Sequence, residues 1–175
     1  MNHETLYQTA LKLVQKNHTL DSGNYPSALP SVGFFYANGT SDIQRGMCEA
    51  GIAFIFSGAK YGVMGAQHYR YDNDNAILVN ARYPVAYHIE ATPAAPLLGM
   101  YITISRNEGA QFFDDLAQIQ PASGWAQSKV EESAPIAVCP LNNDIREAVW
   151  MLLRTLDDPM KASLFGAAHI RAILY

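Results

Sequence analysis

The stretch FIFSGAKYGVMGAQHYRYDNDNAILVNARYPVAYHIEATPAAPLLGMYITIS, residues 54–105, decides the fold of this chain. It consists of short segments rich in aromatic and β-branched residues, and Gly, Asn, Asp or Pro separates each segment from the next. Such segments are typical of strands, and together with those that begin near residue 31 they number about seven within roughly 75 residues. This pattern predicts a sandwich or a barrel.

Alternation within the stretch predicts strands that have one buried face. Val85, Tyr87 and Ile89 lie two residues apart, as do Met100 and Ile102. Successive side chains of a strand point to opposite faces of the sheet, so residues two apart share a face. We therefore expect antiparallel strands that enclose an apolar interior over residues 31–105.

Helical periodicity flanks the strands on both sides. Apolar residues recur at helical spacing within 1–20 and again within 141–175, where a helical hairpin is expected. A further helix is expected over 106–120, with Asn107 as its cap, and a short strand at about 135–140. The predicted fold is mainly β with α: one domain over residues 1–175, an antiparallel β-barrel of the jelly-roll type with an N-terminal helix and C-terminal helices.

Composition narrows the class of protein. The 175 residues carry a formal charge of −4, and the 16 acidic and 12 basic residues are scattered without blocks. Nucleic-acid-binding modules usually present a basic face, so this segment is expected to bind DNA poorly by itself. Cys48 and Cys139 lie far apart, which favours a reducing cytoplasm over a disulfide framework. No apolar run approaches the roughly 20 residues of a membrane span.

One motif raises the possibility of a metal site. Gly62 and His68 are spaced as in the opening of the first metal-binding motif of a cupin barrel, but Arg70 stands where a second histidine is needed. A cation at that position opposes a divalent ion, so we expect no metal and no cofactor. An alternative is that His68, His88 and Glu90 converge in the barrel, as they would in a metal-dependent cupin enzyme such as an isomerase or dioxygenase.

The aromatic content of the strands favours a pocket for a small molecule. Such pockets are lined mainly by apolar and aromatic groups with a few polar anchors. The candidate ligand-binding residues combine aromatic side chains with two polar anchors: Phe34, Tyr36, Arg45, His88 and Tyr101.

The same stretch resembles the N-terminal sensor domain of a subgroup of AraC-family transcriptional regulators. The resemblance is carried by a Gly-x-Lys element at 58–60, an aromatic-x-Tyr-Asp element at 69–72, a Pro-Val strand start at 84–85 and a proline-containing turn at 91–96. It implies a cupin-like sensor barrel joined to a C-terminal domain with two helix-turn-helix units. That DNA-binding domain would follow residue 175.

The resemblance implies a regulator rather than an enzyme. We expect a domain that senses a small-molecule effector, forms a homodimer and controls promoter DNA binding by the C-terminal domain, without contacting a membrane. Apolar residues of the two C-terminal helices are candidates for dimer or interdomain contacts: Leu152, Leu153, Leu156, Leu164 and Ile173. A barrel that serves only as a dimerisation module, without an effector, is a further alternative.

Overall fold

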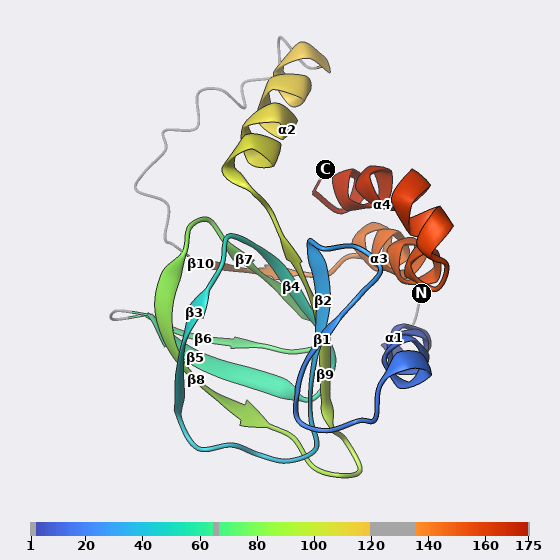
Figure 1. Ribbon diagram of the computed structural model, residues 1–175. Coiled ribbons are helices and arrows are strands. Elements are labelled where there is room, and N and C mark those ends of the chain that lie inside the picture. Colours follow the sequence, from blue (N-terminus) through green and yellow to red (C-terminus); the bar gives the residue numbers. More distant parts are fainter. Residues whose placement is uncertain (1–2, 65–66, 120–135, 175) are drawn as a thin grey trace.

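The computed structural model describes residues 3–64, 67–119 and 136–174. Its strands form two antiparallel sheets that face each other, with helices outside one of them (Figure 1). The large sheet has the strand order β1 (Gly23–Pro26), β2 (Val32–Ala37), β9 (Leu97–Thr103), β4 (Gly51–Ser57), β7 (Asn75–Val79) and β10 (Ile136–Pro140). The small sheet has the order β3 (Gln44–Cys48), β8 (Tyr83–Glu90), β5 (Ala59–Met64) and β6 (Gln67–Tyr71).

The mainly β class with helices at both ends is therefore confirmed. The barrel is not closed, however: among the described strands, no ladder of hydrogen bonds joins the large sheet to the small sheet. The edge strands β1 and β10 pair only within the large sheet, and β3 and β6 only within the small sheet. The structure is a two-sheet sandwich whose layers are held together by side chains.

Two strands were not expected from the sequence. β1 lies in a segment rich in turn formers, and it pairs with β2 at the edge of the sheet, where Pro26 is tolerated because one side of an edge strand makes no ladder bonds. β3 pairs with β8 although four of its five residues are exposed. Neither strand has the apolar alternation on which a prediction could rest.

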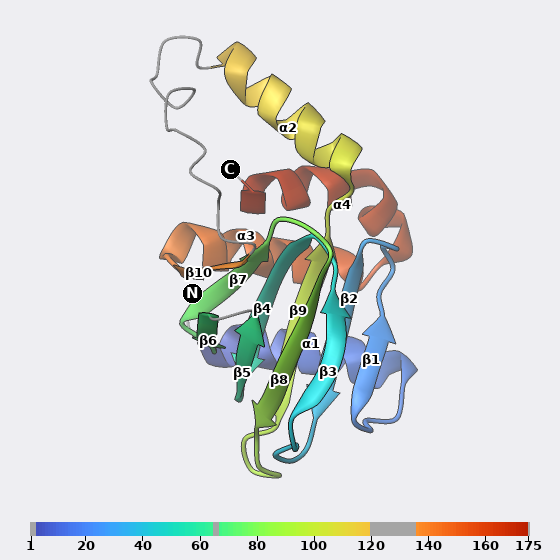
Figure 2. The ribbon, with the colours of Figure 1, turned by 90° about the vertical axis from the view of Figure 1, so that its left-hand side faces the viewer.

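Three helices cover the outer face of the large sheet. α1 (His3–Asn17) and α3 (Asn143–Leu156) pack on each other, and α4 (Pro159–Leu174) packs on α3 (Figure 1). In the view of Figure 2 the small sheet lies in front and α1 lies behind the sandwich, so the outer face of the small sheet is left without a covering helix in the described chain. The molecule is therefore layered as helices, large sheet, small sheet.

The helix α2 (Arg106–Ile119) begins with a different cap from the one expected. The backbone N–H of Ser105 donates to the Glu108 carboxylate at 2.8 Å, and the N–H of Glu108 is 3.2 Å from the Ser105 hydroxyl oxygen. This reciprocal pair is a capping box, which satisfies two otherwise unpaired N–H groups. Asn107, predicted as the cap, lies inside the helix. The side chains of 113–119 lie outside the described part.

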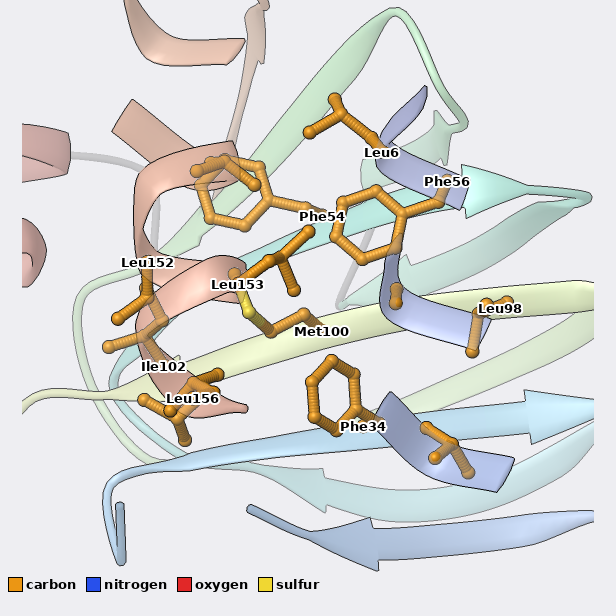
Figure 3. Packing of buried hydrophobic residues seen from close by; sticks show 14 of the residues in the cluster. Leu6, Phe34, Phe54, Phe56, Leu98, Met100, Ile102, Leu152, Leu153 and Leu156 are labelled. Atoms are coloured by element: carbon orange, nitrogen blue, oxygen red, sulfur yellow. The ribbon is translucent and has the colours of Figure 1, made fainter. Parts of the chain in front are cut away.

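The layer between the helices and the large sheet is the main apolar core. Figure 3 shows Phe34, Phe54 and Met100 from the sheet meeting Leu6 of α1 and Leu153 of α3. Phe54, Met100 and Leu153 have no exposed surface, and burial of such a side chain stabilises a fold by roughly 1.5–3 kcal/mol. α1 and α3 are therefore integral to the domain.

A second apolar cluster lies between the two sheets. It includes Phe35, Ile55, Tyr71, Ile89 and Leu97. Since residues 34 and 35 of β2 belong to different clusters, as do 54 and 55 of β4, these strands are buried on both faces. The central strands of the large sheet are thus shared between the two layers.

Candidate functional site

The interior between the sheets has a floor in which aromatic rings lie across glycine positions. Tyr101 of β9 is opposite Gly33 of β2, and Phe35 of β2 is opposite Gly99 of β9. A β-carbon at either glycine would collide with the ring of its cross-strand neighbour. Glycine is therefore what allows these rings to lie along the large sheet instead of standing up from it.

Lys60 of β5 points into this interior. It is opposite Tyr71 and Ile89 on the neighbouring strands, and both of these side chains belong to the interior cluster. Its Nζ lies 3.7 Å from the centroid of the Phe35 ring and 5.2 Å from that of Tyr87. The ammonium of the small sheet therefore reaches the aromatic floor of the large sheet and makes cation–π contacts there.

The Lys60 ammonium has no anionic partner in the described part of the chain. Its only described contacts are with the two rings and, electrostatically, with the Cys48 thiol. Burial lowers the pKa of Lys60 to about 8, because removal from water disfavours the charged form, and the nearby Cys48 offsets this only in part. At neutral pH the amine still carries its proton.

Burial favours the protonated forms of three other polar groups in the interior. Burial raises the pKa of Tyr69 to about 12, and it raises the pKa values of Tyr71 and of the Cys48 thiol. These groups and the hydroxyl of Tyr101 all present O–H or S–H donors to the interior. The site is rich in donors, and among the described side chains that face it only Lys60 is charged.

The interior polar atoms are not sealed from solvent. The Lys60 ammonium and the hydroxyls of Tyr69, Tyr71 and Tyr101 form no hydrogen bond with other groups, as far as the chain is described. Yet no buried side-chain nitrogen or oxygen of the described residues is left without a partner. These atoms must therefore border space that solvent reaches, and Lys60, Tyr69 and Tyr101 are indeed only partly buried.

The structure distributes the five predicted ligand-binding residues over three surfaces. Tyr101 faces the interior. Phe34 and Tyr36 lie together on the opposite face of the large sheet, in the layer under the helices. Arg45 is exposed on β3, and His88 lies on the outer face of the small sheet, stacked on Tyr61 with ring centroids 4.9 Å apart. The five residues do not line one pocket.

Sequence reasoning missed Lys60 as a site residue. The signal in the sequence is a lysine at two-residue spacing from Gly62 within a strand pattern. Residues at that spacing share a face, and Gly62 makes room for the ring of Tyr69 in the same way as the glycines of the floor. Lys60 shares this face, which the structure turns toward the interior.

The side chains of the metal-site alternative lie on the outside of the small sheet. His68 and Glu90 are exposed, and His88 is engaged with Tyr61. Within residues 3–64, 67–119 and 136–174, no group of three or more His, Cys, Asp or Glu side chains could hold a metal ion. Arg70 donates from Nε to the Tyr61 hydroxyl at 2.8 Å and pairs with Asp72, so its role here is to anchor the outer face.

The candidate contact residues of the C-terminal helices divide into two groups. Leu152, Leu153, Leu156 and Ile173 are buried in the chain's own core. Leu164 is 68% exposed, and Met160 and Phe165 beside it on α4 are 73% and 53% exposed. We call Met160, Leu164 and Phe165 the α4 patch. No helix in the described residues combines the length and apolar character needed to cross a membrane.

Comparison with solved structures identifies the fold. The chain is similar to the crystal structure of the apo form of a ToxT point variant from Vibrio cholerae strain SCE256, with a TM-score of 0.53, 9% identity, and coverage of 81% of this chain and 53% of that chain. A second ToxT structure from Vibrio cholerae gives a TM-score of 0.52, 12% identity, and coverage of 77% and 53%. The fold is thus that of the cupin-like N-terminal part of ToxT, as the sequence predicted.

A comparison of the sequence with family patterns identifies the family. The pattern of the AraC-type transcriptional regulator N-terminus matches residues 28–175. The chain belongs to this family, and the expected resemblance is confirmed. It spans about half the length of the ToxT chains that it matches. A comparison with curated protein sequences gave no match.

Proposed function

We propose that this chain senses a small-molecule effector between its two sheets and thereby controls DNA binding by a C-terminal helix-turn-helix domain. The observation that carries the proposal is the interior around Lys60, whose polar atoms lack partners in the described chain and border solvent-reachable space. Family membership supports a regulatory, non-catalytic role. The coverage of about half of each ToxT chain leaves room for a second domain.

The shared strands of the large sheet provide the route from effector to helices. β2, β4 and β9 form the floor of the interior with one face and hold α1 and α3 with the other. An effector alters DNA binding only if it has different affinities for the two arrangements of the domain, and such coupling is typically about 1–3 kcal/mol. A shift of these strands would move α1 and α3, and through α3 also the C-terminal helix α4.

The α4 patch supports a homodimer as the working form. Its three large apolar side chains are exposed on one helix, and a second copy that covers them would remove their apolar surface from water. Regulators that read paired half-sites usually match them with a two-fold protein. We place this dimer in the cytoplasm, since Cys48 and Cys139 are both free thiols.

The test begins with a thermal-shift screen of this chain against a metabolite library. Each compound that raises the melting temperature is then added to the protein containing the C-terminal domain, and binding to DNA upstream of its own gene is measured by mobility shift. The proposal expects at least one compound to change the apparent Kd for DNA. Compounds that bind this domain and leave DNA affinity unchanged would contradict it.

A purely structural role is the second candidate, and the α4 patch is the observation that favours it. A dimerisation module needs this surface and does not need an accessible interior. Such a module would show no ligand-induced shift with any class of compound, while sedimentation would still show a dimer. The same screen therefore separates the two roles.

A further inference from the structure

We propose that the effector carries a carboxylate, which pairs with the Lys60 ammonium between the two sheets, while its apolar body lies on the aromatic floor formed by Phe35 and Tyr101. This inference rests on the proposed sensing function and names the chemical class of ligand that the same site takes. It assigns Lys60 as the residue that determines specificity.

The first argument is the uncompensated charge of Lys60. A partly buried ammonium such as that of Lys60 keeps only part of its hydration, and an anion or several acceptors can replace the part that is lost. The Phe35 and Tyr87 rings supply cation–π contacts, which replace only part of the lost hydration. An anionic group from outside the chain completes the compensation.

The second argument is the absence of an internal anion among the described residues. The acidic side chains nearest in the sequence and on the neighbouring strand face away: Glu49 pairs with Arg82 at 3.0 Å, and Glu90 is exposed. The hydroxyls of Tyr69 and Tyr71 are donors that lack acceptors in the described chain. A carboxylate offers four lone-pair sites, enough for the ammonium and for adjacent phenols.

The composition of the site selects a monoanion over a phosphate. Phosphate sites generally combine several cationic or N–H donors, often the fork of an arginine. Here one ammonium stands among neutral phenols and apolar residues such as Ile55 and Leu97. One carboxylate on an apolar body matches both the single charge and the apolar surroundings.

The competing explanation is that Lys60 has only a structural role, as a contact between the two sheets. In that case its contact with Phe35 holds the layers together, and ligand charge has no influence on binding. The two explanations differ in one measurable quantity, the ratio of affinities for a carboxylate and its neutral amide.

The experiment measures that ratio with defined probes. Benzoate and octanoate, benzamide and octanamide, and inorganic phosphate are titrated into the chain at pH 7 and followed by calorimetry and ligand-observed NMR. Proteins compared are the wild type, Lys60→Met, which removes the charge at similar length, and Lys12→Met, which removes the charge of an exposed lysine on α1.

We expect at least one carboxylate to bind about tenfold or more tightly than its amide. Lys60→Met should bring that ratio close to one, and Lys12→Met should leave it unchanged. Circular dichroism and urea unfolding of Lys60→Met verify that the variant is folded. Lys60→Arg provides a second folded variant, in which the charge is retained and the preference for carboxylates should persist.

Four results would overturn the inference. The amides could bind as tightly as the carboxylates, or the charge preference could survive in Lys60→Met. Phosphate alone could bind, or no carboxylate could reach a millimolar Kd. Neutral compounds that occupy the interior and change DNA binding would leave the proposed function standing without the carboxylate. A carboxylate that binds through Lys60 and leaves DNA binding unchanged would support the carboxylate site and contradict the proposed function.

Discussion

Replacement of Lys60 by methionine should stabilise the empty domain and remove a specific pH dependence. The pKa of Lys60 falls from the ordinary 10.5 to about 8 because burial disfavours the ammonium. Below pH 8 the amine is protonated in both the folded and the unfolded chain, so the folded state carries the whole penalty. A difference of this size between the two pKa values corresponds to on the order of 3 kcal/mol.

The sign of the pH effect follows from proton binding. Between pH 8 and 10.5 the unfolded chain holds the Lys60 proton and the folded chain has lost it, so stability rises with pH over that window. From pH 7 to pH 9 the gain is on the order of 1 kcal/mol. Burial raises the pKa of the Cys48 thiol, which acts in the opposite direction above about pH 9, so the useful window ends there.

Urea unfolding at pH 7, 8 and 9 measures this effect directly. Subtraction of the Lys60→Met profile from the wild-type profile removes most of what Cys48 and the other groups contribute. Lys12→Met is the matched control, since Lys12 is exposed on α1. We expect the methionine variant to be the more stable protein at pH 7 by about 1–3 kcal/mol, and its advantage to shrink as the pH rises.

The reasoning would be refuted by a Lys60→Met variant that is less stable than the wild type at pH 7. That result would mean that the cation–π contact with Phe35 outweighs the cost of burying the charge. A difference profile that is flat from pH 7 to pH 9 would show that Lys60 keeps an ordinary pKa and is better solvated than its surroundings indicate.

Three further predictions concern packing and assembly. Arg146 is 8% exposed, and it donates to the His3 ring at 2.8 Å and to the carbonyl oxygen of residue 73 at 3.0 Å. Its replacement by Ala should lower the free energy of unfolding in urea by about 1–3 kcal/mol. The same change at the exposed Arg82 should lower it by under about 1 kcal/mol. Gly99→Ala should destabilise by about 1–3 kcal/mol or more, because the new β-carbon meets the ring of the opposite residue and a backbone oxygen, whereas Gly23→Ala, with open space around it, should not; equal effects would be contrary to the packing described. Leu164→Glu should leave unfolding within about 0.5 kcal/mol of the wild type and convert a dimer to a monomer in sedimentation, and a dimer that persists would show that the α4 patch is not the interface.

The fold was predictable where one face of an element meets water. β8 alternates buried Val85 and Ile89 with the exposed Pro84 and Glu90, so its inner face could be read from the sequence. The helices α1 and α3 likewise carry apolar stripes at helical spacing. β3 has no such contrast, because most of its residues are exposed, and its place is set by pairing with β8.

The candidate site was less predictable because both faces of the large sheet are buried. Phe34 and Phe35 are both apolar and adjacent, and nothing local says which one faces the helices and which one the interior. For this reason the sequence groups Phe34 and Tyr36 with Tyr101, whereas the structure has Phe34 and Tyr36 on the helix side of the large sheet and Tyr101 on the interior side. The inward position of Lys60 is not evident from the sequence because lysine in a strand is usually exposed, and its burial depends on a ring from the other sheet.

The pairing of glycines with aromatic rings between β2 and β9 has a consequence for the shape of a ligand. Each strand contributes one glycine and one aromatic residue, Gly33 with Phe35 and Gly99 with Tyr101, so both rings lie down and present their faces, as the position of the Lys60 ammonium above Phe35 indicates. A surface of ring faces stacks best with flat molecules. In the site that we propose, the two sheets would therefore have different roles: the large sheet would select for planarity, and the small sheet, through the Lys60 amine, for charge.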